Sequence, residues 1–155
     1  MKDVLFIDID GVIMSRIFVD GGFPQVLDAF ESIEKLKKRF GCNIFIISKS
    51  SRVDERLEVI KWLSRNKFYS ITGVPIQKLI LCDRESEKAE ESKKKKATHF
   101  IGSRRETMVY LRRVGVKNRL LFKGNKEEGE DDFDFILSEV VQVESWQEIQ
   151  KILLG

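Results

Sequence analysis

Short, largely apolar runs alternate with amphipathic stretches along this whole sequence. The apolar runs cover residues 4–7, 43–47, 78–82, 98–101, 119–122 and 140–143. Strands that are apolar on both faces are typical of a parallel sheet that is covered by helices on both sides. The alternation therefore predicts an α/β fold with a doubly wound, Rossmann-like parallel sheet.

The stretches between these runs show the three- and four-residue spacing of amphipathic helices. We expect helices near residues 24–40, 53–63, 85–96, 108–114 and 146–154. Pro24 is placed in the first turn of the first helix, and Gly41 is placed to end it. The second helix has four apolar residues on one face: Val53, Leu57, Ile60 and Leu63.

Length and composition limit the classes of protein to consider. A chain of 155 residues fits one domain, so we expect a single domain over residues 1–155. Its 28 basic and 25 acidic residues give a net charge of +3, which permits an anionic ligand but does not indicate nucleic-acid binding. Cys42 and Cys82 lack metal-type spacing and are predicted to be buried free thiols. No apolar stretch reaches the roughly 20 residues that span a bilayer, so we expect a cytoplasmic protein without a membrane partner.

The first apolar run ends in two carboxylates, Asp8 and Asp10, which are followed by Gly11. Side chains alternate along a strand, so both carboxylates lie on the same side of the chain. They repel each other unless a cation lies between them or one of them holds a proton. An oxygen-preferring ion such as Mg²⁺ meets the first condition, and a nucleophile paired with a general acid meets the second. The alternative is a solvated strand end whose acids cap the next turn.

A further polar residue, Ser48, also lies at the predicted end of a strand. Ligands of doubly wound sheets bind outside the carboxyl ends of the strands, and Ser48 ends the second apolar run just as Asp8 ends the first. Two charge-biased stretches, residues 93–96 and 127–134, are interpreted as solvated surface. His99, the only histidine, and Trp146 are predicted to be packing residues.

The strand that ends in Asp8-Ile9-Asp10-Gly11-Val12, the second strand that ends in Ser48 and the helical Lys88 together resemble the haloacid-dehalogenase-like phosphohydrolases. The resemblance covers nearly the whole chain and implies a form with little or no cap domain. It implies that Asp8 attacks phosphorus to form an aspartyl-phosphate, while Asp10 is the general acid and base and its carbonyl helps to hold Mg²⁺. Ser48, with Lys49 beside it, would bind the phosphoryl group, and Lys88 would neutralise its charge.

The family carries a fourth conserved motif after the fourth strand, and this sequence departs from it there. Ser103 stands where the resemblance places a metal-binding aspartate, and a hydroxyl is a poor substitute for a carboxylate on Mg²⁺. Glu106, one helical turn further on, is the candidate to replace it, so the expected metal ligands are Asp8, Asp10, Ser103 and Glu106.

Two functions remain open at this point. The first is a Mg²⁺-dependent phosphomonoesterase that acts on a nucleotide, a sugar phosphate or a phosphorylated macromolecule. The second is a catalytically weak or inactive binding or regulatory module that has lost the metal-binding acid. A receiver-type phospho-switch fits less well, because receivers carry the phospho-acceptor at the end of the third strand.

Overall fold

The computed structural model describes residues 2–123 and 139–155. Its strands are β1 (Leu5–Asp8), β2 (Ile44–Lys49), β3 (Leu79–Cys82), β4 (His99–Gly102), β5 (Asn118–Phe122) and β6 (Val141–Val143). Its α-helices are α1 (Ala29–Phe40), α2 (Val53–Arg65), α3 (Phe68–Thr72), α4 (Glu85–Lys94), α5 (Arg105–Arg113) and α7 (Trp146–Leu154). A single 3-10 turn, η1 (Ile76–Lys78), precedes β3.

The six strands form one sheet in the order β3-β2-β1-β4-β5-β6, and all neighbouring pairs are parallel. The chain moves outward from β1 to β3, then returns to the other side of β1 and moves outward again to β6. The switch point therefore lies between β1 and β4, which is where ligands of such sheets bind. The predicted doubly wound α/β fold is confirmed.

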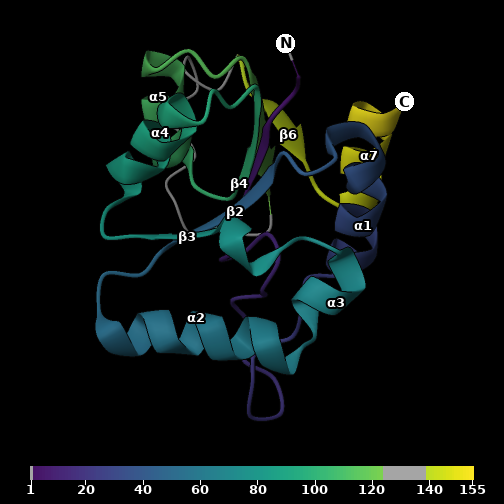
Figure 1. The fold of residues 1–155 in the computed structure, drawn as a ribbon, viewed down its shortest axis with the longest axis vertical. Helices are drawn as coiled ribbons and strands as arrows, with labels where there is room; N and C mark the ends of the chain where they lie inside the picture. The colour runs from purple at the N-terminus through teal and green to yellow at the C-terminus, as the bar shows by residue number, and fades with distance from the viewer. Residues whose placement is uncertain (1, 124–138) are drawn as a thin grey trace.

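The helices cover both faces of the sheet. Helices α4 and α5 lie on one face, while α1 and α7 pack together on the other (Figure 1). Two apolar clusters fill the spaces between the sheet and these layers, and β1 contributes alternate residues to them: Leu5 and Ile7 to one, and Phe6 to the other. The cluster that contains Phe6 also holds Ala89 of α4 and Leu111 of α5. Continued alternation therefore turns Asp8 toward α4, which is the geometric basis of the site described below.

The first helix begins later than the sequence predicts. Pro24 lies outside it, in a short hairpin where its carbonyl accepts a hydrogen bond from Ser15 N at 2.8 Å and Val26 N donates to Ile13 O at 2.8 Å. Proline has no N–H to offer, but its carbonyl is free to pair in this way. The expected first-turn position of Pro24 was therefore wrong.

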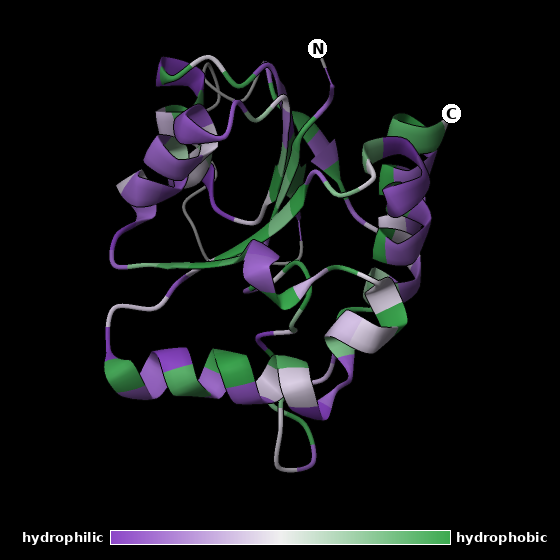
Figure 2. Cartoon of the chain, in the orientation of Figure 1, coloured by the Kyte–Doolittle hydropathy of each residue, from purple (hydrophilic) through white to green (hydrophobic). Residues whose placement is uncertain are grey.

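Helix α2 also differs from expectation, because it lies beyond the ends of the strands and covers neither face of the sheet (Figure 1). Only Val59 and Leu63 of this helix are buried, whereas Val53, Leu57 and Ile60 are exposed. Hydrophobic and hydrophilic segments alternate along α2 in Figure 2. Apolar spacing identified the helix correctly, but not the face that it buries.

The structure also places the unpredicted helix α3, the two cysteines, His99 and Trp146. Helix α3 was not predicted, and Cys42 is exposed whereas Cys82 is buried as expected. His99 is packed, and Trp146 is 1% exposed with its indole N–H donating to Val12 O at 2.8 Å, so both are packing residues. Residues 127–134 lie outside the described residues.

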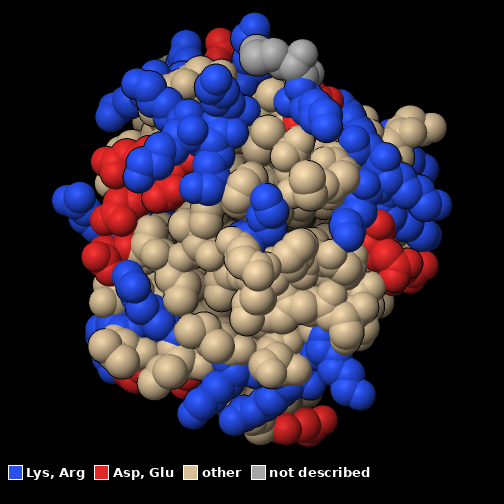
Figure 3. All heavy atoms as spheres, in the orientation of Figure 1, with Lys and Arg blue, Asp and Glu red and all other residues tan. Residues whose placement is uncertain are grey.

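Charges on the surface are mixed. In the view of Figure 3, basic side chains gather over α4 and α5 and over α1 and α7, with acidic side chains beside them. Within residues 2–123 and 139–155, no helix is long and apolar enough to cross a membrane.

Candidate active site

The candidate site lies at the carboxyl ends of the central strands. Asp8 is the last residue of β1, Ser48 is the penultimate residue of β2, and Ser103 directly follows β4. The structure brings these three residues together with Asp10 and with Lys88 of α4. Five of the residues singled out in the sequence therefore meet at the switch point of the sheet.

A tight turn sets Asp10 in place. Gly11 has a φ of 77°, in the left-handed region that side chains other than glycine rarely adopt. The amides of Ile13 and Met14 both donate to Ile9 O at 2.9 Å, which closes the turn. The chain thereby leaves the sheet immediately after Asp10, so that this carboxylate lies at the rim of the sheet.

Lys88 joins two buried carboxylates. Its ammonium nitrogen lies 3.0 and 2.9 Å from the two carboxylate oxygens of Asp8, and 3.1 and 3.0 Å from those of Glu85. The three side chains are almost fully buried, at 2% exposure for Lys88, 1% for Asp8 and 9% for Glu85. Glu85 and Lys88 are both on α4, three residues apart, so the helix presents them to Asp8 as a unit.

The burial and the pairing of these groups determine their charge. Burial raises the pKa of Asp8 to about 6, although Lys88 opposes the shift. Burial lowers the pKa of Lys88, but the carboxylates of Asp8 and Glu85 outweigh that effect and leave it raised. Burial also raises the pKa of Glu85, yet Lys88 and the Thr107 hydroxyl more than compensate and hold it below its ordinary value. At neutral pH the site therefore holds a permanent cation beside a carboxylate that remains ionised.

Asp10 is placed differently from Asp8. Burial raises its pKa as well, although Lys88 and Arg16 oppose the shift. Ser48 donates to an Asp10 carboxylate oxygen at 3.4 Å, and the hydroxyl of Ser50 lies 3.0 Å from that of Ser48. A carboxyl group with a raised pKa at the edge of a cavity suits general acid and base catalysis.

Ser103 makes a contact that bears on the fourth motif. Its hydroxyl donates to the backbone carbonyl of Asp10 at 2.9 Å. Asp10 O is the carbonyl that the family resemblance assigns to Mg²⁺. The Ser103 hydroxyl and a metal ion would therefore compete for the same carbonyl oxygen of Asp10.

A polar cavity of about 240 Å³ opens onto this cluster. Its lining comprises four basic residues (Arg16, Lys49, Lys88 and Arg104) and three acidic residues (Asp10, Glu55 and Glu85). Arg104 also lies 3.8 Å from Glu85, which connects it to the buried cluster. Basic side chains from four separate segments converge on the cavity, and this arrangement suits a small anion such as a phosphoryl group.

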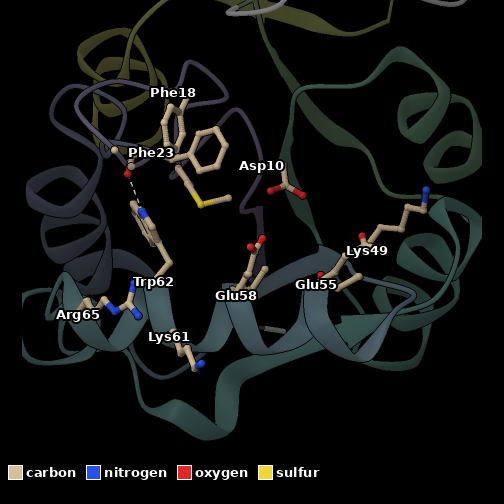
Figure 4. Close-up of a pocket in the computed structure, with 14 residues that line it drawn as sticks. Asp10, Phe18, Phe23, Lys49, Glu55, Glu58, Lys61, Trp62 and Arg65 are labelled. Carbon is tan, nitrogen blue, oxygen red and sulfur yellow. Dashed lines mark hydrogen bonds between the residues drawn. The ribbon is translucent and has the colours of Figure 1, made fainter.

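A second cavity of about 420 Å³ adjoins the first and shares Asp10, Lys49 and Glu55 with it. Its walls are the segment that follows β1 and the upper surface of α2 (Figure 4). Three aromatic residues, Phe18, Phe23 and Trp62, line the end away from Lys49 (Figure 4).

Some predicted residues do not join the cluster. Glu106 is exposed, and its carboxylate accepts a hydrogen bond from the hydroxyl of Tyr110 at 3.4 Å. Glu106 lines neither cavity. Lys93 and Lys94 lie in the last turn of α4, and Lys95 and Lys96 follow it, at the opposite end of the helix from Glu85.

The residue that sequence reasoning missed is Glu85. Its spacing of three from Lys88 was visible in the sequence but gave Glu85 no role at the site, whereas the structure buries Lys88 between Glu85 and Asp8. Thr107 of α5 donates to Glu85 at 2.7 Å and was not singled out either. A glutamate in the first turn after an apolar run, followed by a lysine three residues later, was the available signal.

Comparison with models of protein families gave no match, and comparison with curated protein sequences gave none either. The geometry of the site is therefore the basis for assigning a function to this chain.

Proposed function

We propose that this chain is a phosphomonoester hydrolase of the haloacid-dehalogenase-like class that works through an aspartyl-phosphate on Asp8. The observation that carries the proposal is the pairing of Asp8 with Lys88 at the switch point, beside a cavity lined by Arg16, Lys49 and Arg104. A carboxylate nucleophile needs an adjacent cation to accept an approaching phosphoryl group, because two anions otherwise repel.

The residues divide the reaction between them. Asp8 attacks phosphorus, and the bond from phosphorus to the leaving oxygen breaks. Asp10 gives its proton to that oxygen, and the raised pKa of Asp10 supports this role. In the second half, Asp10 takes a proton from water, whose oxygen attacks phosphorus and releases Asp8. Lys88 stays charged throughout, since two carboxylates raise its pKa.

The donor set at the site fits Mg²⁺ only in part. Three oxygen donors lie at the carboxyl ends of β1 and β4: the carboxylate of Asp8, the carbonyl of Asp10 and the hydroxyl of Ser103. Mg²⁺ often uses one or two carboxylates together with water and substrate oxygens. Of these donors only Asp8 carries a charge, so we propose that these three groups hold Mg²⁺ weakly. The ion would supply positive charge to the phosphoryl oxygens. The exposed position of Glu106 gives no support for its proposed role as a ligand.

A second function is favoured by one observation. The hydrogen bond from Ser103 to Asp10 O already occupies the carbonyl that a metal ion would use. If this bond persists in solution, the chain binds phosphorylated ligands without turning them over. The site would then be a binding or regulatory module on the same fold.

One experiment separates the two functions. The chain is incubated with a panel of nucleotides, sugar phosphates and phosphoserine, with and without Mg²⁺, and released phosphate is measured. The hydrolase predicts turnover that requires Asp8 and rises with Mg²⁺. Saturable binding of the same compounds without release of phosphate would identify the module.

A further inference from the structure

The wall of the larger cavity carries an aromatic surface that is already arranged in the structure. The rings of Phe18 and Phe23 pack edge to face with their centroids 5.2 Å apart. The indole N–H of Trp62 donates to Phe23 O at 2.6 Å, which ties this surface to α2. Phe18 is nevertheless 62% exposed and Phe23 38% exposed. The rings therefore remain available to a flat partner.

Acidic side chains of α2 line the same cavity. Glu58 lies between the aromatic surface and Asp10, whereas Glu55 lies on the side of Lys49 (Figure 4). Carboxylates accept hydrogen bonds from hydroxyl and amino groups, and they repel further anionic groups. The middle of the cavity thus favours a neutral, donor-rich moiety such as a ribose.

The position of Asp10 sets the direction in which a substrate would lie. The general acid must contact the leaving oxygen, so the leaving group extends from phosphorus toward Asp10. Asp10 lines both cavities, and the phosphoryl group belongs to the basic one. The leaving group therefore enters the larger cavity, whose volume of about 420 Å³ is within the range of small-molecule sites.

From this arrangement we infer that the ligand is a nucleoside monophosphate, with its base against Phe18 and Phe23, its ribose beside Glu58, and its phosphate at Lys88. The inference rests on the proposed function for the placement of the phosphate. Any of the nucleobases can stack on an aromatic side chain, and such stacking contributes strongly to affinity. A plain sugar phosphate leaves the aromatic end of the cavity empty.

The test compares ligands that differ in one part. Binding of AMP, ribose 5-phosphate and phenyl phosphate is measured by calorimetry on the full chain with Asp8→Asn, which removes the nucleophile so that turnover does not interfere. The same titrations are repeated after adding Phe18→Ala. The matched control is Ile17→Ala, because Ile17 is adjacent and 70% exposed but does not line the cavity.

We expect AMP to bind at least about tenfold more tightly than either other ligand, and Phe18→Ala to remove most of that preference whereas Ile17→Ala does not. Equal affinity for AMP and ribose 5-phosphate, or a preference that survives Phe18→Ala, would overturn the inference. Phenyl phosphate that binds as tightly as AMP would overturn the assignment of a nucleoside. If the unmutated chain hydrolyses every phosphate alike, the inference fails while the hydrolase stands. If AMP binds selectively but is never hydrolysed, the hydrolase fails while the inference stands.

Discussion

Lys88 holds both carboxylate oxygens of Asp8, at 3.0 and 2.9 Å, although 80 residues separate the two in the chain. The contact joins the end of β1 to the first turns of α4, and both side chains are buried. A buried ion pair is weak support for stability, because desolvation offsets much of the attraction between the charges. The proposed catalytic role explains better why this ion pair lies at the switch point, beside a basic cavity.

The first prediction concerns the nucleophile. Asp8→Asn keeps the shape of the side chain and removes the charge that attacks phosphorus. Hydrolysis of an aryl phosphate should fall by several powers of ten, because no covalent intermediate can form. Release of phosphate is measured alongside circular dichroism, which checks that the variant folds. A folded Asp8→Asn chain with near-normal turnover would remove Asp8 from the proposed role.

The second prediction concerns Lys88 and a matched lysine on the same helix. Lys88→Ala leaves Asp8 and Glu85 buried without their cation, so the free energy of unfolding should drop by about 3 kcal/mol. Activity should drop by far more than the loss of folded protein explains. The control is Lys94→Ala, since Lys94 is 74% exposed and lies 3.7 Å from Glu91 in a surface ion pair. Denaturant unfolding should place the control within about 0.5 kcal/mol of the parent.

Equal losses of activity in Lys88→Ala and Lys94→Ala would contradict this assignment. A greater loss in Lys94→Ala, or in the corresponding variants of residues 93, 95 or 96, would assign the charge-neutralising lysine to residues 93–96 in place of Lys88. Unfolding curves for each variant separate these outcomes from simple destabilisation.

The third prediction concerns His99, at the opposite end of the strands. Burial lowers its pKa, and the nearby Arg39 adds to the shift while Asp3 opposes it. Its Nδ1 lies 2.8 Å from the hydroxyl of Thr98, and its Nε2 lies 3.4 Å from a guanidinium nitrogen of Arg39. The hydroxyl of Thr98 donates to Val4 O, so Nδ1–H is the donor to Thr98 and Nε2 is the unprotonated nitrogen. A proton added at Nε2 would face the guanidinium.

The sign of the pH effect follows from this lowered pKa. Below about pH 6.5 the unfolded chain binds a proton at His99 more readily than the folded chain, so this residue makes stability fall as the pH falls, by at most about 1.4 kcal/mol per unit. The raised pKa of Asp8 acts in the opposite direction near pH 6, so the parent must be compared with His99→Gln. Denaturant unfolding at pH 7 and pH 5 should show that His99→Gln loses less stability than the parent. The same loss in both chains would show that His99 does not titrate differently on folding.

Much of the fold could be predicted from the sequence, because the strands of a buried parallel sheet must be apolar on both faces. The alternation of apolar runs with amphipathic stretches predicted the class of the fold, and the carboxylates after residues 4–7 marked the end of a strand. Burial was harder to predict for α2. Val53, Leu57 and Ile60 have helical spacing, but α2 lies beyond the strand ends, where neither face of the sheet is available to cover them.

The candidate site could be predicted where its residues end strands, as Asp8 and Ser48 do. It could not be predicted where charge and burial compete. Glu85 and Lys88 look like an ordinary exposed pair on a helix, and their buried contact with a second carboxylate, Asp8 on β1, is not visible in the local sequence. Ser103 was recognised as a missing acid, but its bond to the carbonyl of Asp10 depends on how β1 and β4 pair at their ends.

The last prediction tests the fourth motif through stability, so that it does not depend on turnover. Ser103→Asp removes the hydroxyl that donates to Asp10 O and places a carboxylate beside that carbonyl, so the melting temperature should fall in EDTA. Mg²⁺ supplies the missing positive charge and should restore the melting temperature, because a ligand that binds only the folded chain stabilises the folded chain by mass action. Gly102 is a poorer position for the acid, since an added Cβ would lie 3.0 Å from Met108 Cε and 3.1 Å from Phe100 Cε1. The control is Ser103→Asn, which can still donate to Asp10 O and adds no charge.

Thermal unfolding and calorimetric titration of Mg²⁺ are measured for the parent, Ser103→Asp, Ser103→Asn and Glu106→Gln. The parent should bind Mg²⁺ weakly, Ser103→Asp more tightly and with a larger rise in melting temperature, and Ser103→Asn no more tightly than the parent. Glu106→Gln should match the parent, because Glu106 is exposed and contacts Tyr110. Tight binding by the parent that Glu106→Gln abolishes would restore Glu106 as the replacement ligand. A parent that neither binds Mg²⁺ nor hydrolyses phosphate, and a Ser103→Asp chain that does both, would identify the natural protein as the binding module.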